Sequence, residues 1–133
     1  MFLLSNLLAA DLAAQIDKQV ESGSDWLAFQ WKLSAPQCQT VTTGFQLNLT
    51  NLRNNSYDIY DCNITDQQTL DSKFVFNTSF NDCGERINVM PCSDFEIIVI
   101  PQILNSLYDG SDDSALGRTT CKSVELGYYA NRI

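Results

Sequence analysis

Apolar side chains recur at every second position along two stretches of this sequence. Residues 27–33 alternate large apolar side chains with smaller or polar ones, and residues 41–49 show the same alternation. Successive side chains of a β-strand point to opposite faces, so a period of two is typical of strands with one buried and one wet face. Both stretches are therefore predicted to be strands, and Asn48 falls on the wet phase of the second.

Shorter stretches extend the same pattern along the chain. Further strands are predicted over residues 57–62, 73–76, 86–89, 94–100 and 114–121. Turn-forming residues such as Pro36 and Gly110 separate the stretches. Seven short strands with frequent turns predict an all-β fold, a seven-stranded antiparallel β-sandwich.

The two ends of the chain lack this pattern. Residues 1–15 are apolar and end in small residues but have no basic start, so we expect a signal peptide, an upstream segment or a helical start to the mature chain. Residues 16–121 form the predicted domain, and residues 122–133 form a C-terminal tail. No stretch reaches the roughly 18 apolar residues of a membrane span, so we expect no membrane span in this chain.

Composition excludes several functions. The 133 residues carry a net charge of −8, which repels the phosphate backbone, so no nucleic acid is expected as a partner. The chain has no histidine, which argues against Ser-His-Asp and Cys-His catalysis and against most zinc sites. Asp109, Ser111 and Asp113 have the spacing of a calcium loop, but Ser114 and Thr120 stand where that loop needs Gly and Glu. We therefore expect no enzyme, no metal and no cofactor.

Cysteines and glycosylation sequons point to the compartment. Asn-x-Ser/Thr sequons begin at Asn48, Asn54, Asn63 and Asn77. The five cysteines have no C-x-x-C spacing, which disfavours zinc knuckles and thioredoxin-like sites. Together these features predict an extracellular glycoprotein, secreted or part of a membrane-protein ectodomain, with exposed sequons and two disulfides.

Two disulfide arrangements are open. Cys92 and Cys121 flank a hairpin centred near residues 106 and 107 and would then lie opposite one another. In that arrangement Cys38 pairs with Cys83, and Cys62 is left over. The rival arrangement pairs Cys62 with Cys92.

Three pieces of the sequence resemble the fibronectin type III domain. They are Trp31 followed by Pro36, the stretch Gly44-Phe45-Gln46-Leu47, and the run Val89-Met90-Pro91-Cys92-Ser93-Asp94-Phe95-Glu96-Ile97-Ile98-Val99. The run is similar to the family's Leu-x-Pro-x-Thr-x-Tyr-x-Val-x-Val, which leads into its sixth strand. The resemblance implies an immunoglobulin-like sandwich with Trp31 in its core.

This chain departs from the family at two points. Phe95 replaces the tyrosine of the tyrosine corner, so a hydrogen bond of about 1 kcal/mol is lost unless another group supplies it. Cys92 stands where cysteine-bearing variants of invertebrate receptor ectodomains also have cysteine. There is no Arg-Gly-Asp, so integrin binding is not implied.

The predicted function is a non-enzymatic recognition or spacer module of a receptor or cell-adhesion ectodomain, with a protein partner. The alternative is a free secreted ligand-binding protein of β-barrel type. The predicted binding surface comprises Trp26 and the acidic loop of Tyr108, Asp109, Asp112 and Asp113.

Overall fold

The computed structural model describes residues 13–35, 38, 41–64, 69–70, 73–104, 106–108 and 113–121. The regular elements in these ranges are β1 (Ala14–Ile16), β2 (Glu21–Ser22), β3 (Leu27–Leu33), β4 (Thr42–Asn51), β5 (Ser56–Asn63), β6 (Thr69–Leu70), β7 (Lys73–Asn77), β8 (Asp94–Ile103), β9 (Ser106–Leu107) and β10 (Ala115–Arg118). None of the described residues forms a helix with the length and hydropathy that crossing a membrane requires.

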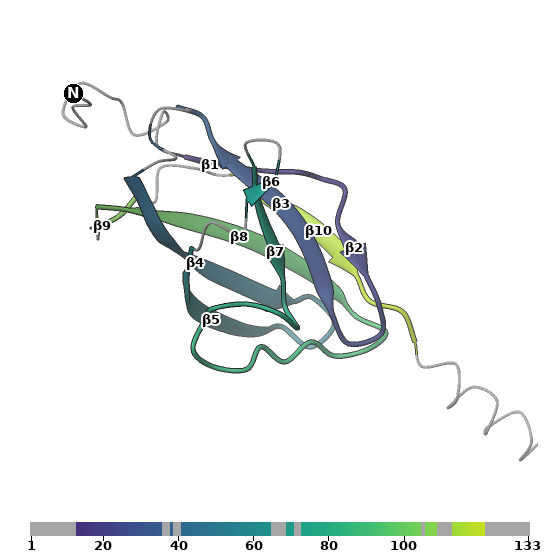
Figure 1. Ribbon diagram of the computed structural model, residues 1–133. Helices are drawn as coiled ribbons and strands as arrows, with labels where there is room; N and C mark the ends of the chain where they lie inside the picture. Colours follow the sequence, from purple (N-terminus) through teal and green to yellow (C-terminus); the bar gives the residue numbers. More distant parts are fainter. Residues whose placement is uncertain are drawn as a thin grey trace, which may run out of the picture.

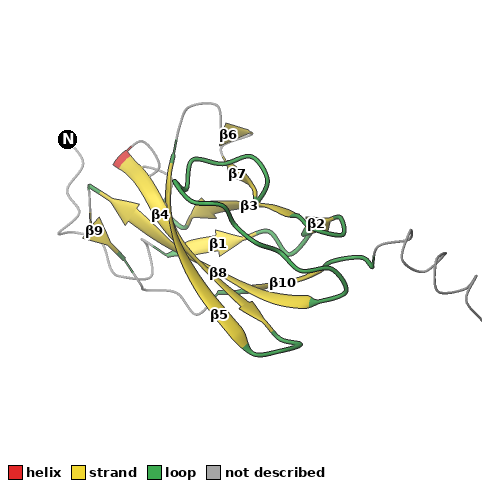
Figure 2. Cartoon of the chain, turned by 90° about the horizontal axis from the view of Figure 1, so that it is seen from below, coloured by secondary structure: helices red, strands yellow, loops and turns green. Residues whose placement is uncertain are grey.

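The strands form two antiparallel sheets that pack face to face (Figures 1 and 2). In the β3 sheet, β1 and β2 follow one edge of β3, while β7 and then β6 lie on the other. The β4 sheet has the order β10-β8-β4-β5, with β9 also paired to β8. The predicted all-β sandwich is therefore confirmed.

Aromatic side chains fill the space between the sheets. Trp31 is 1% exposed, and its ring centroid lies 4.4 Å from that of Phe74 and 5.3 Å from that of Phe45. Phe45 meets Phe76 edge-on at 5.2 Å. From β8, alternate residues from Phe95 to Val99 are buried against this cluster. The residues predicted to lie inward on β3, β4 and β8 are therefore in the core.

The predicted strand over residues 86–89 is wrong. Ile87 and Val89 are buried and their neighbours are exposed, so the side chains do alternate. However, no strand in the described part of the chain pairs with this segment, which instead runs past β5 in Figure 1. Burial raises the pKa of Tyr60 on β5, and the neighbouring backbone of Asn88 lowers it in part. Burial of Ile87 and Val89 thus holds the segment without a ladder.

The short strands β1, β2, β6 and β9 were not predicted. Each has two or three residues, which is too few for a period to be visible. The first strand of the described residues begins at Ala14, two residues before the predicted domain boundary at residue 16. Residues 1–12 and 122–133, predicted to be a leading segment and a tail, lie outside the described residues.

Two disulfides join Cys62 to Cys83 and Cys92 to Cys121. The second pair is one of the predicted pairs, whereas Cys38–Cys83 and Cys62–Cys92 are both wrong. Cys62 points inward from β5, and the Asn63 N–H donates to the Asp82 carbonyl at 3.1 Å, which brings Cys83 beside it. The cysteine outside both disulfides is Cys38, which is buried.

The described chain enters and leaves the sandwich at opposite ends. β3 begins after the turn of residues 23–26 and ends at Leu33, where β1 pairs with it. The Thr120 N–H donates to the Gly23 carbonyl at 3.0 Å, so the chain leaves beside that turn. We call the end that contains residues 23–26, 52–55 and 119–121 the exit pole.

Candidate functional site

The described residues of the predicted acidic loop, Tyr108 and Asp113, make contacts within the sandwich. Tyr108 is half-buried and packs against the core, and Asp109 and Asp112 lie outside the described residues. The Asp113 carboxylate accepts the Ile16 N–H at 2.7 Å and forms an ion pair with Lys18 at 2.6 Å. Burial raises the pKa of Asp113, but these two contacts outweigh burial and lower it. Asp113 therefore anchors β1 rather than presenting an unengaged charge to a partner.

Trp26 is half-buried in the turn between β2 and β3. Its indole lies against Gly23, where an added Cβ would overlap the ring. The Gly23 N–H also donates to the Trp26 carbonyl at 3.1 Å. Trp26 thus closes its own turn at the exit pole, and part of its surface is used inside the molecule.

The four sequon asparagines have different surroundings. Asn54 and Asn63 are exposed and Asn77 is half-buried. Asn48 is only 8% exposed, so the prediction that all four lie exposed is wrong. Asn48 does point away from the core, but it lies between Ile98 on β8 and Ile59 on β5, directly opposite in register. These two neighbours cover it from its own face of the sheet.

Two sequons form Asx turns. The Asn54 side-chain oxygen accepts the Ser56 N–H at 2.9 Å, and the Asn77 oxygen accepts the Ser79 N–H at 2.8 Å. In both sequons the third residue fixes the oxygen of the asparagine. The amide nitrogen, to which a glycan is attached, takes no part in that turn.

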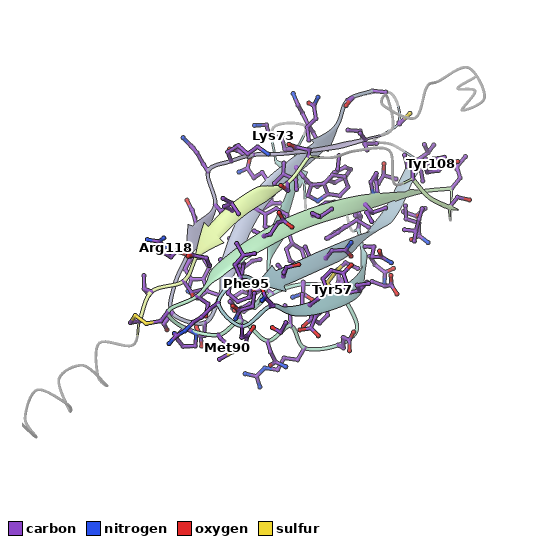
Figure 3. The ribbon with its side chains drawn as sticks, turned by 180° about the vertical axis from the view of Figure 1, so that it is seen from behind. Tyr57, Lys73, Met90, Phe95, Tyr108 and Arg118 are labelled. Carbon is purple, nitrogen blue, oxygen red and sulfur yellow. A yellow bond between two sulfur atoms is a disulfide. The ribbon has the colours of Figure 1, made fainter. Side chains whose placement is uncertain are left out.

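The outer face of the β4 sheet, on the side away from the β3 sheet, carries exposed apolar side chains. Tyr57 is 53% exposed, Ile59 46% and Leu116 65%. One row across the sheet is Ile98–Asn48–Ile59, and the next is Leu116–Glu96–Thr50–Tyr57. Figure 3 shows Tyr57 and Arg118 on this side of the ribbon. Sequence reasoning missed this surface, although Tyr57 and Ile59 already share one phase of a predicted strand.

Asn48 leaves an unsatisfied group at the centre of this face. Its side-chain oxygen is buried and has no hydrogen-bond partner among the described residues. A buried acceptor without a donor costs about 1–3 kcal/mol. A donor brought by a partner would remove that cost, provided that the side chains around Asn48 move to admit it.

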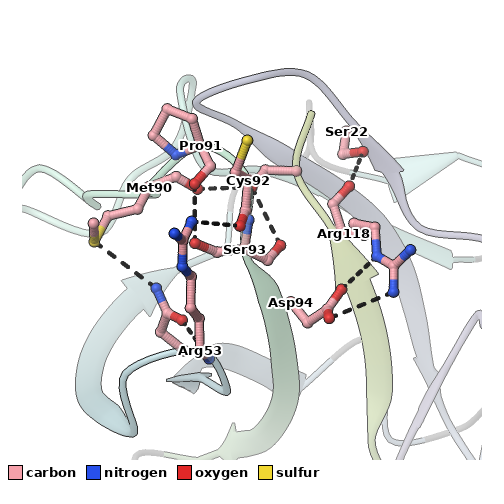
Figure 4. Close-up of polar contacts among 10 residues, drawn as sticks. Ser22, Arg53, Met90, Pro91, Cys92, Ser93, Asp94 and Arg118 are labelled. Atoms are coloured by element: carbon pink, nitrogen blue, oxygen red, sulfur yellow. Dashed lines mark hydrogen bonds and ion pairs between the residues drawn. The ribbon is translucent and has the colours of Figure 1, made fainter. Parts of the chain in front are cut away.

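Polar contacts fix the bend before β8 at the exit pole (Figure 4). The buried Thr119 hydroxyl donates to the Met90 carbonyl at 2.7 Å and accepts the Ser93 N–H at 3.0 Å. The bend has a positive φ of 54° at Cys92, whose disulfide closes on Cys121. Phe95 has no hydroxyl, and the hydroxyl that hydrogen-bonds the backbone at this bend comes from Thr119.

A groove of about 790 Å³ lies between Asp25 and the segment of residues 84–91. Glu85 and Arg86 line it with mostly polar neighbours. Within the described ranges, no three side chains of His, Cys, Asp or Glu are grouped so that they could hold a metal ion. We assign no chemistry to this groove.

No family model matches the chain, and no curated protein matches it significantly.

Proposed function

We propose that this protein is a non-enzymatic, extracellular recognition module with a fibronectin type III-like, immunoglobulin-like sandwich. It belongs to a receptor or cell-adhesion ectodomain and binds a protein partner through the outer face of the β4 sheet. It uses no cofactor.

Strand order supports the fold assignment. If β1 and β2 are taken as one interrupted edge strand, the described residues form seven main strands, apart from the two-residue β6 and β9. The third, sixth and seventh, β4, β8 and β10, share one sheet, while the first, second and fifth share the other. This is how an immunoglobulin sandwich divides its corresponding strands. The fourth strand, β5, extends the β4 sheet.

The disulfides support the proposed extracellular location. Two disulfides in a chain of this size indicate an oxidising environment, as outside the cell. The exposed sequons at Asn54 and Asn63 agree with passage through the secretory pathway.

The outer face of the β4 sheet is the observation that carries the proposed recognition role. Tyrosine is enriched at interface hot spots, and Tyr57 lies here beside exposed Ile59. At its centre, Asn48 adds a buried acceptor that has no donor among the described residues. A partner that lays apolar side chains on Ile59 and Leu116 and offers one donor would complement the face.

Two other functions agree with fewer features of the molecule. A ligand-binding barrel needs an empty interior, and here Trp31, Phe45, Phe74 and Phe76 occupy the space between the sheets. A spacer module is entered and left at opposite poles, and the described residues enter and leave the sandwich in that way. The spacer is therefore the second candidate.

A binding screen tests the proposal. The full chain, secreted and tetramerised, is applied to an array of extracellular domains. Ile59→Asp and Leu116→Asp should each weaken a specific interaction about tenfold or more, since they place a charge in the apolar face. Gln15→Asp adds the same charge on the exposed side of β1 and is the matched control. Binding unaffected by the face variants would contradict the proposed surface, and no binding at all would favour the spacer.

A further inference from the structure

Asn54 lies in a turn that fixes its side chain. Its oxygen accepts the Ser56 N–H at 2.9 Å, and its amide nitrogen lies 3.8 Å from the Met90 sulfur. The Asn51 amide nitrogen contacts the same sulfur at 3.9 Å. The atom that would carry a glycan is therefore held beside a methionine side chain.

Further contacts hold the turn in place. Asn55 has a positive φ of 58°, and the Arg53 N–H donates to the Asn51 side-chain oxygen at 2.9 Å. The Arg53 guanidinium reaches across to donate to the Cys92 carbonyl at 3.1 Å (Figure 4). The turn is thus tied to the bend that contains Met90, and Asn54 and Met90 stay together.

Two exposed apolar side chains lie near Asn54. Met90 is 52% exposed, and Leu52 of the same turn is 45% exposed. A sugar ring has C–H faces that pack against such side chains and remove them from water. A glycan that starts at the Asn54 amide nitrogen reaches this surface without crossing solvent.

Among the residues that the structure describes, no other sequon asparagine is held against a methionine in this way. Asn63 stands at the far end of β5, about 20 Å or more away along the strand, where its backbone N–H donates to Asp82. Asn77 forms an Asx turn like Asn54 and is bridged to the exposed Phe80, but its amide nitrogen has no methionine sulfur as a partner among the described residues. Asn48 is buried within its sheet.

We infer that Asn54 carries an N-linked glycan whose first sugars lie on Met90 and Leu52 and shield the exit pole. The inference rests on the extracellular location in the proposed function. Attachment joins the Asn54 amide nitrogen to C1 of an N-acetylglucosamine from a lipid-linked oligosaccharide, with loss of one N–H proton and departure of the lipid pyrophosphate. The glycan then leaves the outer face of the β4 sheet open to a protein partner.

Oxidation of Met90 reports on this contact. The chain has two methionines, Met1 and Met90, so peptide mapping follows Met90 without ambiguity. Exposure governs the rate at which peroxide converts methionine to its sulfoxide. The full chain is secreted from a eukaryotic host, and oxidation is compared with that of Ser56→Ala. This variant removes the Asn54 sequon but keeps Asn54 and the Ser56 N–H. Asn63→Gln removes a distant sequon and is the control.

We expect Met90 to oxidise several-fold faster in Ser56→Ala and at the wild-type rate in Asn63→Gln. Enzymatic removal of the glycan from folded wild-type protein should give the same acceleration, whether or not the variant folds well. Equal rates with Asn54 occupied would overturn the contact. An unoccupied Asn54 beside an occupied Asn63 or Asn77 would overturn the inference but leave the proposed function standing. No glycan at any sequon would count against both.

Discussion

At the scale of single residues, Thr119 and Asn48 have opposite effects on stability. The Thr119 hydroxyl is buried and joins two backbone groups of the bend before β8. The Asn48 oxygen is buried and has no partner in the described part of the chain. Thr119 gives hydrogen-bond partners to two backbone groups, whereas the oxygen of Asn48 lacks a partner among the described residues.

Thr119→Val should destabilise the protein by about 1–3 kcal/mol, because it leaves the buried Ser93 N–H without its acceptor. Chemical denaturation of the disulfide-bonded protein measures the change. Thr120→Val is the matched control, because Thr120 is exposed and contributes backbone bonds that survive the change. If the two variants are equally stable, the hydroxyl of Thr119 does not hold the bend.

Asn48→Val should stabilise the unglycosylated protein by about 1–2 kcal/mol, since it removes the unsatisfied oxygen and adds a β-branched residue to a central strand. The free energy of unfolding is compared with that of Gln46→Val. Gln46 shares the face and the strand but is half-buried, so its change should be within about 0.5 kcal/mol. A loss of stability in Asn48→Val would mean that the amide is satisfied in solution.

At the scale of elements, β1 depends on a side chain far away in the sequence. Asp113 accepts the Ile16 N–H and pairs with Lys18, and so ties β1 to the residues that lead into β10. β1 has only three residues of its own to pair with β3. The ionised form of Asp113 is the form that makes these contacts.

The lowered pKa of Asp113 predicts how stability depends on pH. A carboxyl whose pKa is lower in the folded state adds stability above the unfolded value of about 3.9, and this is lost as pH falls towards the folded value. Asp113→Asn should cost about 1 kcal/mol at pH 7, and the difference from wild type should shrink below about pH 4. Asp61→Asn, an exposed change of equal charge on β5, should give a small difference. A difference for Asp113→Asn that is constant with pH would contradict this role.

The long strands could be predicted from the sequence, whereas the unpaired segment of residues 86–89 and the burial of Asn48 could not. A period of two is visible in β3 and β4, which have seven and ten residues, and it correctly predicts burial of Trp31 and Phe45. The same period misassigned residues 86–89, because burial alternates there without a strand to pair with. Asn48 was misjudged because burial by neighbours on the same face depends on register, which joins residues distant in sequence.

At the scale of the whole molecule, the two disulfides act on different parts of the sandwich. Cys62–Cys83 joins β5 to the extended segment that follows β7, and Cys92–Cys121 closes the exit pole. They enclose separations of 21 and 29 residues, for which loop closure predicts about 2–4 kcal/mol each.

Replacing Cys62 and Cys83 together by alanine, or Cys92 and Cys121 together, should therefore lower the free energy of unfolding by about 2–4 kcal/mol in each case. Peptide mapping of unreduced wild-type protein should find both links. A link from Cys38 to Cys83 would contradict the arrangement of β5 beside the segment after β7.

A glycan placed on each face tests the proposed recognition surface most directly. Ile59→Asn with Asp61→Thr creates a sequon on the outer face of the β4 sheet, and Lys32→Asn creates one on the outer face of the β3 sheet by using Ser34. Once intact mass confirms occupancy, affinity for the protein partner is measured. The β4-sheet glycan should weaken binding about tenfold or more, and the β3-sheet glycan should leave it unchanged. Unchanged binding with a glycan at position 59, or loss only with the glycan at position 32, would contradict the account.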